Sequence, residues 1–374
     1  MKILVLNYEY PPIGGGAAPV SKDLAVELAK RGNTVTVLTM KYGDAPDVDL
    51  EGGVTVYRIK CLRKKKASCS PLEQLSYLIA VRRFMKNHEE LQRYDVCHAH
   101  FIIPTAEVAR NIKQKYGIPY IITAHGSDVE GHNKKRIVML MHRVLRSSWR
   151  KIVRDAYCVV SPSEYLLKRM KNNYEKGNYT FIPNGIDYNL FSGLNSHSKK
   201  EKIILVMGRI QKFKNVQFII SAFSRIHGHD DWKLVIAGDG PYRREIEKLI
   251  DQLGLKNRIQ LLGWLDSKSE TLLGVLEFSS IYVSASQFEN CPMSVIEATV
   301  AGCYPLASDI PAHRQMLQQQ YLFSLEDEDS LVKKLSERMA LGANACKIDM
   351  SKYDWDIISN QYEELMAKSS NGRV

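Results

Sequence analysis

Two glutamates eight residues apart give the strongest local indication of chemistry in the sequence. Glu289 and Glu297 belong to the segment Ser286-Gln-Phe-Glu-Asn-Cys-Pro-Met-Ser-Val-Ile-Glu-Ala298, which we expect to lead from a strand into a helix. Carboxylates accept hydrogen bonds from vicinal hydroxyl groups, so the pair would suit one ribose and one hexose. The same carboxylates would also serve as helix caps or as solvated surface charges, and the pair alone does not separate these roles.

A basic loop follows the apolar run 202–207. It reads Gly208-Arg-Ile-Gln-Lys-Phe-Lys-Asn215 and carries Arg209 and Lys214. An arginine binds phosphate oxygens through a planar fork and a lysine adds a point charge, so the two together would neutralise a leaving diphosphate without a metal ion. Because basic loops are common, this one gains weight only beside the other motifs.

Three consecutive glycines, Gly14, Gly15 and Gly16, stand between the first apolar run and a helical pattern over 20–31. Glycines let the backbone approach a ligand closely, and a helix N-terminus offers free N–H groups to an anion, so the loop predicts phosphate binding. The dinucleotide fingerprint fits poorly, because Pro19 replaces its third glycine and no acidic residue follows the second strand. A turn without a ligand is the alternative.

Histidines form a further candidate group. His125 lies just beyond the apolar run 120–123, where its side chain would meet a reacting sugar. His98 and His100 share one face of an expected strand, and with His125 they would supply three metal ligands. No carboxylate is matched to them, so we expect no metal site and favour a buried, hydrogen-bonded His98.

The elements that must position these motifs alternate between apolar strands and helical stretches. We expect strands over 2–7, 34–40, 54–59, 94–98, 120–123, 158–161, 202–207, 233–237, 259–262, 281–284 and 304–307. This alternation predicts parallel sheets covered by helices, in the α/β class. The 374 residues suffice for two domains, and the polar stretch 193–201 separates two similar plans. Ligands of such sheets bind at the carboxyl ends of the strands, facing a cleft.

Charge is distributed unevenly along the chain. The net charge is +11, but residues 1–187 hold 30 lysines and arginines against 18 aspartates and glutamates, so the surplus lies entirely in the first half. Nucleic acid, an anionic membrane or merely a solvated basic surface would each explain this. The apolar start is expected to be a strand and not a signal peptide. No apolar run is long enough to span a membrane. The seven cysteines include no C-x-x-C pair, which suits a reducing compartment. We therefore expect a cytoplasmic protein.

Together these motifs resemble the large family of retaining glycosyltransferases of the GT-B fold that includes sucrose synthase and the phosphatidylinositol mannosyltransferases. The resemblance covers nearly the whole chain. Its residues are Gly14 to Gly16, His125-Gly126, Pro183-Asn-Gly-Ile-Asp187, Gly208-Arg209 with Lys214, Gly238-Asp-Gly-Pro241, and Glu289 with Glu297 and Ala298. It implies two Rossmann-like domains facing each other across a cleft, residues 1–187 on the acceptor side and 188–352 on the donor side. A final helix, within about 353–374, would return to the first domain.

The resemblance also implies roles for single residues. Arg209 and Lys214, which follow Gly208, would hold the diphosphate, Glu297 the ribose hydroxyls and Glu289 the donor hexose. His125 would meet the transferred sugar. The nucleotide base would lie near Gly263, Trp264 and Leu265, and Gly15 or Gly16 would approach the diphosphate from the other domain. The donor would be a UDP- or GDP-sugar, with no further cofactor and no metal. Gln315 stands where similar proteins often have glutamate, which puts some detail of sugar recognition in doubt.

The composition of residues 134–154 gives the indication of the acceptor. Between 134 and 154, Ile137, Leu140, Met141, Val144 and Leu145 recur at helical spacing among eight cations. Such a basic amphipathic helix lies in membrane interfaces, so we expect a peripheral enzyme at the inner face of the membrane, with a glycan or lipid-linked acceptor and no nucleic-acid partner. The alternative is that the apolar stripe packs on the core. A sugar-nucleotide epimerase and a non-catalytic sugar-binding partner are the rival functions.

Overall fold

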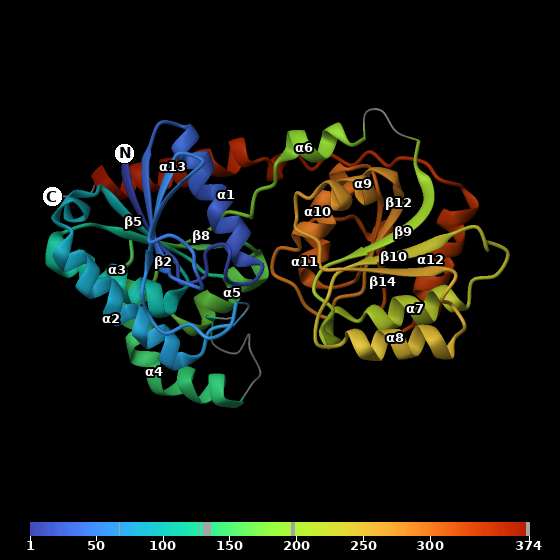
Figure 1. Ribbon diagram of the computed structural model, residues 1–374, viewed down its shortest axis with the longest axis horizontal. Coiled ribbons are helices and arrows are strands. Elements are labelled where there is room, and N and C mark those ends of the chain that lie inside the picture. The colour runs from blue at the N-terminus through green and yellow to red at the C-terminus, as the bar shows by residue number, and fades with distance from the viewer. Residues whose placement is uncertain (67, 127, 130–135, 196–198, 372–374) are drawn as a thin grey trace. The chain divides into compact units, whose positions relative to one another are not determined.

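The computed structural model describes residues 1–374 except 67, 127, 130–135, 196–198 and 372–374, and of 136–142 it describes the backbone alone. The chain divides into two compact units. Unit 1 consists of residues 1–185 and 355–374, and unit 2 of residues 186–354. Each is a sheet with helices on both faces (Figure 1), so the α/β prediction is confirmed.

The unit 1 sheet has eight strands in the order β3-β4-β2-β1-β5-β6-β7-β8. Their bounds are β1 Lys2–Leu6, β2 Thr34–Met40, β3 Val48–Glu51, β4 Val54–Ile59, β5 Val96–His100, β6 Tyr120–Thr123, β7 Cys158–Ser161 and β8 Tyr179–Phe181. Every pair is parallel except the antiparallel edge pair β3 and β4. The strand order reverses beside β1, and ligands bind α/β sheets at such a point.

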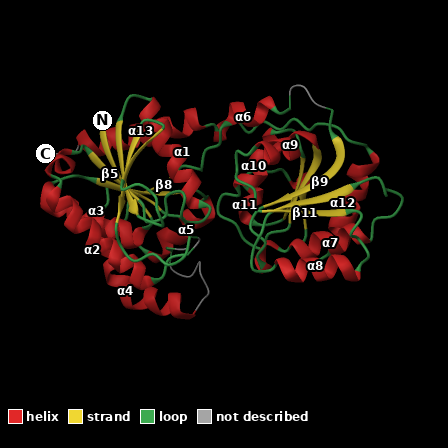
Figure 2. Ribbon diagram, viewed as in Figure 1, coloured by secondary structure: helices red, strands yellow, loops and turns green. Residues whose placement is uncertain are grey.

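Helices cover both faces of this sheet (Figure 2). Their bounds are α1 Ala17–Lys30, α2 Pro71–Asn87, α3 Glu107–Tyr116, α4 Arg136–Asp155, α5 Glu164–Asn173 and α13 Trp355–Asn371. Helices α2, α3 and α4 share one apolar core with the sheet, while α13 lies beside α1 and contacts β5 and β6. The phenol of Tyr362 on α13 lies 3.0 Å from the Thr123 hydroxyl at the end of β6. The last helix therefore completes unit 1.

Unit 2 contains six parallel strands in the order β11-β10-β9-β12-β13-β14. The strands are β9 Glu201–Met207, β10 Lys233–Ala237, β11 Ile259–Gly263, β12 Ser279–Ser284, β13 Tyr304–Ser308 and β14 Leu322–Phe323. The helices are α6 Tyr188–Gly193, α7 Val216–Ser224, α8 Arg243–Gln252, α9 Glu270–Phe278, α10 Met293–Val300, α11 Pro311–Arg314 and α12 Glu328–Ala340. The first strand, β9, lies between β10 and β12, so the loops that leave β9 and β12 meet at one edge of the sheet.

In the part of the chain that the structure describes, no helix combines the length and apolar character needed to cross a membrane.

Candidate active site

The loops after β9 and β12 bring together one residue from each of two predicted motifs, Lys214 and Glu289. The ammonium group of Lys214 donates a hydrogen bond to Oε1 of Glu289, forming an ion pair whose side chains are 25% and 14% exposed. The Ser286 hydroxyl donates to the same oxygen at 2.7 Å. Glu289 is thus held by a cation and a hydroxyl, while the lysine keeps two of its three N–H donors for other acceptors.

Backbone and aromatic contacts fix these two loops against each other. The amide of Gln287 donates to the carbonyl of Phe213 at 2.8 Å. The rings of Phe213 and Phe288 stack with centroids 4.4 Å apart and an interplanar angle of 19°. The Lys214–Glu289 pair therefore lies in a loop framework that is braced on both sides.

A small pocket opens beside this pair. Its lining residues are Val206 to Arg209, Lys214, Val216, Tyr282 to Ser286, and Ser294. Arg209 is exposed, and among the described residues its side chain makes no hydrogen bond or ion pair. Arg209 and Lys214 both line the pocket, and their role toward a diphosphate stays a prediction. An anionic group such as a diphosphate would match these donors.

Close backbone packing shapes the floor of the site. The Gly208 amide donates to the carbonyl of Ala237 at 3.0 Å, and a Cβ atom at Gly238 would collide with the carbonyl oxygen of Gly208. Only glycine fits at position 238, because the ends of β9 and β10 approach so closely. Gly238 in turn forms an isolated bridge with Gly263 at the end of β11.

The other predicted donor contacts lie outside the pocket lining. Glu297 is the fifth residue of α10 and is partly buried. Burial raises the pKa of Tyr282, and the negative charges of Glu289 and Glu297 raise it further, so both glutamates lie near this phenol. Trp264 is 64% exposed, and Leu265 packs partly buried against the core. The roles of these residues toward a nucleotide remain predictions.

A buried histidine behind the ion pair was not predicted as a site residue. His313 is fully buried, and its Nδ1 lies 2.7 Å from the backbone oxygen of Ser308. The Ser308 hydroxyl donates to the backbone oxygen of Ser286 at 2.5 Å. Burial lowers the pKa of His313, the charge of Glu289 opposes that shift, and the charge of Lys214 adds to it. The only signal available in the sequence was a histidine shortly after an apolar strand.

In unit 1 the three histidines of the predicted cluster do come together. The rings of His98 and His100 have centroids 4.3 Å apart, and Nδ1 of His100 lies 3.0 Å from Nε2 of His125. Burial lowers the pKa of His98 and of His125 to about 3, so these rings are neutral near pH 7. His98 lies 2.8 Å from the Thr123 hydroxyl, which is the buried, hydrogen-bonded arrangement we favoured. Within the described residues no group of three or more His, Cys, Asp or Glu side chains is placed to hold a metal ion.

A buried carboxylate holds the backbone at His125. Asp128 accepts a hydrogen bond from the His125 amide at 3.0 Å and another from the Ile102 amide at 2.8 Å. Burial raises the pKa of Asp128, and these backbone hydrogen bonds act in the opposite direction. Phe101, whose ring centroid is 4.6 Å from that of His125, has φ of 74°. A non-glycine residue in this region is strained, so the surrounding structure determines its place.

The glycine loop lies at the same carboxyl edge of the unit 1 sheet. Gly14 has φ of 105°, and a Cβ atom there would approach the Cβ of Glu9 to 2.7 Å. Gly15 donates its amide to the Glu9 carboxylate at 3.3 Å. Gly16 begins α1 without a side-chain cap, and Cβ atoms at Gly15 or Gly16 would meet nothing within 4 Å. The loop therefore leaves room for an approaching group, while a carboxylate already accepts from one of its amides.

Comparisons with known proteins agree with this architecture. Residues 14–190 match the model of Glycosyltransferase Family 4, and residues 192–348 match that of Glycosyl transferases group 1. The chain is 24% identical over 353 residues to the UDP-Gal:alpha-D-GlcNAc-diphosphoundecaprenol alpha-1,3-galactosyltransferase of Escherichia coli, covering 89% of this chain and 87% of that protein. It is 22% identical over 322 residues to the alpha-monoglucosyldiacylglycerol synthase of Acholeplasma laidlawii, covering 80% and 78%.

Among solved structures, the fold resembles sucrose-phosphate synthase from Thermosynechococcus elongatus. The TM-score is 0.79 at 18% identity, and the likeness covers 98% of each chain. The predicted GT-B fold is thereby confirmed. Because the two family models between them span residues 14–348 almost without a gap, the chain belongs to the group 1 glycosyltransferases.

Proposed function

We propose that this glycosyltransferase moves a hexose from a nucleoside diphosphate sugar to a lipid-linked or other membrane-associated acceptor, with retention of the anomeric configuration. The observation that carries the proposal is the pocket at the carboxyl edge of unit 2, where Arg209 and Lys214 present cations beside Glu289. A diphosphate is bound by cations, and the hydroxyl groups of a hexose are bound by hydrogen-bond acceptors such as carboxylates. The two cations line the pocket, and Glu289 lies outside the lining but is bonded to two lining residues, Lys214 and Ser286.

In the proposed reaction the two cations act on the leaving group. Negative charge develops on the diphosphate as the bond to the sugar breaks, and Arg209 and Lys214 would stabilise it more in the transition state than in the ground state. Glu289 would accept hydrogen bonds from the hexose, and Glu297 from the ribose. The base would lie near Gly263 to Leu265. The two cations would replace the divalent ion of metal-dependent transferases, so we propose that no metal or further cofactor is needed.

The state of Glu289 supports front-side displacement over a two-carboxylate scheme. Its Oε1 is engaged by Lys214 and by the Ser286 hydroxyl, which stabilises the carboxylate and weakens it as a nucleophile. A double-displacement glycosidase mechanism requires a carboxylate that attacks the sugar carbon and forms a covalent intermediate. We therefore propose that retention arises by attack of the acceptor on the face from which the diphosphate leaves.

The names of two relatives support the proposed donor and acceptor classes. The name of the Escherichia coli relative contains UDP-Gal and a diphosphoundecaprenol, and that of the Acholeplasma relative contains a diacylglycerol. A UDP- or GDP-sugar is the proposed donor for this chain. His125, at the carboxyl edge of unit 1, would meet the transferred sugar. With a lipid-linked acceptor and a basic unit 1, the enzyme would act in the cytoplasm as a peripheral protein of the inner membrane face.

Acceptor-dependent release of nucleoside diphosphate tests this function. Wild type and Arg209→Met are incubated with UDP-, GDP- and ADP-sugars, with and without a lipid extract, and the released diphosphate is measured. We expect release with one donor only when lipid is present, and a loss of at least about tenfold in Arg209→Met. Conversion of the donor into an epimer without diphosphate release would instead identify an epimerase. The anomeric proton of the product, measured by NMR, tests retention.

A further inference from the structure

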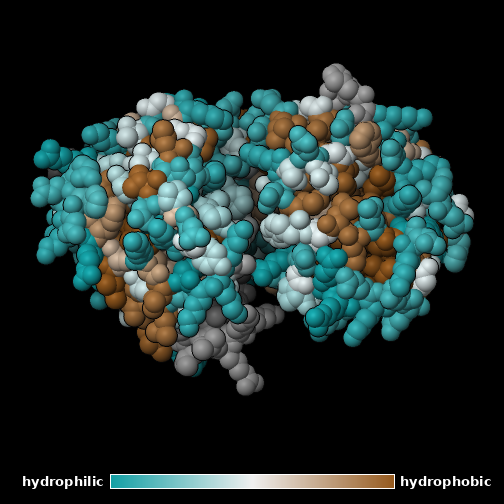
Figure 3. All heavy atoms as spheres, viewed as in Figure 1, coloured by the Kyte–Doolittle hydropathy of each residue, from teal (hydrophilic) through white to brown (hydrophobic). Residues whose placement is uncertain are grey.

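Helix α2 in unit 1 carries an apolar ridge that the protein's core does not use. Leu72, Leu75 and Ile79 are 73%, 52% and 56% exposed. Their spacing of three and four residues places them side by side on one face of the helix. Figure 3 shows apolar side chains gathered over this part of unit 1. We call Leu72, Leu75 and Ile79 the α2 ridge.

The opposite face of α2 supplies its packing against the core. Glu73, Tyr77, Val81 and Met85 recur every four residues and are all buried. The phenol of Tyr77 donates to the carbonyl of Leu38 at 2.7 Å. The helix is therefore anchored without the α2 ridge, and the solvent exposure of three large apolar side chains is left without a structural purpose.

Cations flank the α2 ridge at both ends. Arg83 and Lys86 continue the same helical face toward its C-terminus and are exposed. Before the helix, Lys64, Lys65 and Lys66 are exposed in the preceding loop. The only carboxylate between residues 52 and 88 is Glu73, which is buried. Within residues 52–88 the apolar strip has cations at both ends and no exposed carboxylate, and the exposed Glu89 and Glu90 follow only after the helix has ended. Such a strip is complementary to an anionic lipid surface.

The loop that carries Lys64, Lys65 and Lys66, which we call the lysine loop, is joined to both α2 and the glycine loop. The Gly14 amide donates to the backbone oxygen of Lys66 at 2.9 Å. The Lys64 amide donates to Glu73 at 2.5 Å, and the carboxylate of Glu73 also accepts from the amide of Ser70, completing a capping box at the start of α2. These contacts lower the pKa of Glu73 to about 2, so its charge persists down to acidic pH. Hydrogen bonds therefore connect the start of α2, which carries the α2 ridge, with the glycine loop.

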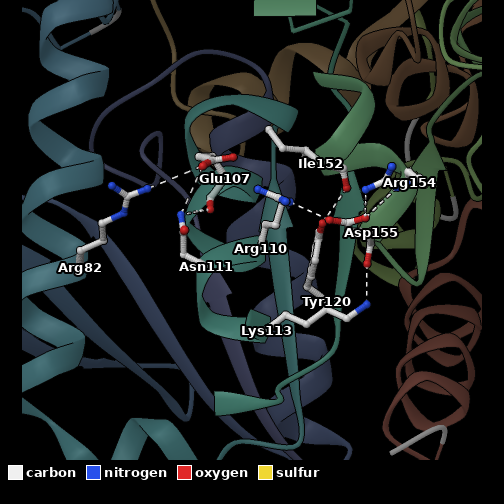
Figure 4. Close-up of polar contacts among 9 residues, drawn as sticks. All are labelled: Arg82, Glu107, Arg110, Asn111, Lys113, Tyr120, Ile152, Arg154 and Asp155. Carbon is white, nitrogen blue, oxygen red and sulfur yellow. Dashed lines mark hydrogen bonds and ion pairs between the residues drawn. The ribbon is translucent and has the colours of Figure 1, made fainter. Parts of the chain in front are cut away.

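Other cations of unit 1 are engaged within the protein. Between α3 and α4, Arg110 and Arg154 bind the carboxylate of Asp155 at 2.8 Å and 3.0 Å, and Lys113 donates to its backbone oxygen at 2.7 Å (Figure 4). Arg82 lies 3.7 Å from Glu107 on the neighbouring helix. The Arg110–Asp155 and Arg82–Glu107 pairs join neighbouring helices, and Arg154 pairs with Asp155 within α4. The lysines of the lysine loop form no ion pair among the described residues. The lysine loop is thus the better electrostatic contact.

We infer that the α2 ridge inserts into the interface of an anionic bilayer, with Lys64 to Lys66 and the cations Arg83 and Lys86 against the lipid phosphates. The inference rests on the proposed lipid-linked acceptor. It names the surface of unit 1 that would contact the membrane in which this acceptor lies. It shifts the expected membrane contact from α4 to α2. Of the α4 stripe predicted from the sequence, the side chains of Ile137, Leu140 and Met141 lie outside the described residues. Leu145 packs against the core, and Val144 is 70% exposed.

The test is co-sedimentation of the full chain with vesicles. The probes are phosphatidylcholine vesicles with and without phosphatidylglycerol, at low and high ionic strength. The test variant replaces Leu72, Leu75 and Ile79 together by serine. The matched control is Leu50→Ser, because Leu50 is 72% exposed in the same unit but stands between Asp49 and Glu51 on β3. A second variant, Lys64→Gln with Lys65→Gln and Lys66→Gln, removes charge and leaves the α2 ridge intact.

We expect wild type and Leu50→Ser to bind anionic vesicles equally and to bind neutral vesicles weakly. The serine variant should lose at least about tenfold in partitioning, since three apolar side chains no longer enter the interface. The glutamine variant should lose about fivefold for each lysine, with its binding less sensitive to salt. Because the replaced residues are exposed, circular dichroism of all variants should match wild type.

Three results would overturn the inference. Equal vesicle binding by wild type and the serine variant would exclude the α2 ridge as the contact. Binding that ignores phosphatidylglycerol would exclude the electrostatic part. A change of oligomeric state in the serine variant, with vesicle binding unchanged, would assign the α2 ridge to contact between two copies of the chain. Because the vesicle assay contains no nucleotide sugar, it reports on membrane binding alone. If the vesicles bind as expected but the separate assay with nucleotide sugars and lipid shows no transfer, the proposed function is refuted and the membrane contact stands.

Discussion

Replacing Lys214 by methionine separates the structural and catalytic parts of the site. The substitution keeps the length of the side chain but removes the cation that pairs with Glu289. Among the described residues, the carboxylate of Glu289, 14% exposed, would then keep as side-chain partner only the hydroxyl of Ser286, at 2.7 Å. A poorly hydrated charge left with one neutral partner is destabilising.

The size of the effect follows from this burial. A hydrogen bond to a charged group contributes about 1.5–3 kcal/mol, and partial exposure of both side chains screens the pair. We expect Lys214→Met to lower the free energy of unfolding by about 1–2 kcal/mol, which lowers the melting temperature by about 2–4 °C per kcal/mol in a unit of this size. Arg209→Met should stay within about 0.5 kcal/mol of wild type, because the exposed arginine has no described side-chain partner.

Thermal unfolding and turnover together make the assay. Both Lys214→Met and Arg209→Met should lower kcat/KM by on the order of tenfold to a thousandfold. Lys212→Met is the matched control, since it removes an exposed lysine two residues from Lys214 and should alter neither quantity. Adding Glu289→Gln to Lys214→Met should restore part of the lost stability, because no unpaired charge remains. Wild-type stability of Lys214→Met would refute the ion pair, and wild-type turnover of both cation variants would refute the diphosphate assignment.

Three further results are expected. Transfer should persist in excess EDTA, because side-chain cations replace a metal ion; a strict need for added manganese or magnesium would contradict this. Gly238→Ala should destabilise unit 2 by about 1–3 kcal/mol through its collision with a backbone oxygen, whereas Gly15→Ala has open space and should melt within about 2 °C of wild type; equal melting of the two variants would refute the packing argument. Burial lowers the pKa of His98 and His125 to about 3, so below pH about 6.5 the unfolded chain binds more protons than the folded one. The free energy of unfolding should therefore fall by up to about 1.4 kcal/mol per pH unit per histidine as the pH drops toward 3. Chemical denaturation of His98→Gln should show a shallower fall, and an unchanged slope would contradict the assignment.

The strands that could be predicted from sequence are those buried on both faces. The apolar runs 34–40 and 120–123 coincide with β2 and β6, because a strand covered on both faces is apolar throughout. Strand β3, Val48–Glu51, was missed. It is an antiparallel edge strand whose residues alternate between exposed and partly buried, and half of them are acidic. Its pairing with β4 depends on the turn between them and not on an apolar run.

Pairings between distant residues were beyond the reach of the sequence. Lys214 and Glu289 were each predicted as site residues, but their ion pair was not. The pair forms because β9 lies next to β12 in the sheet, and the sequence pattern does not reveal that strand order. His313 was missed because a buried histidine has no distinguishing pattern. The roles of these residues toward a donor came from a family resemblance and stay predictions until they are measured.

The most direct test of the central claim is the stoichiometry of transfer. Wild-type protein, its preferred nucleotide sugar and a lipid extract are incubated together, and the nucleoside diphosphate and the lipids are quantified by mass spectrometry. We predict one hexose added to a lipid-linked acceptor for each diphosphate released, with both products lost together in Arg209→Met. Diphosphate release with free hexose and no glycosylated lipid, or glycosylation that survives in Arg209→Met at the wild-type rate, would contradict the account.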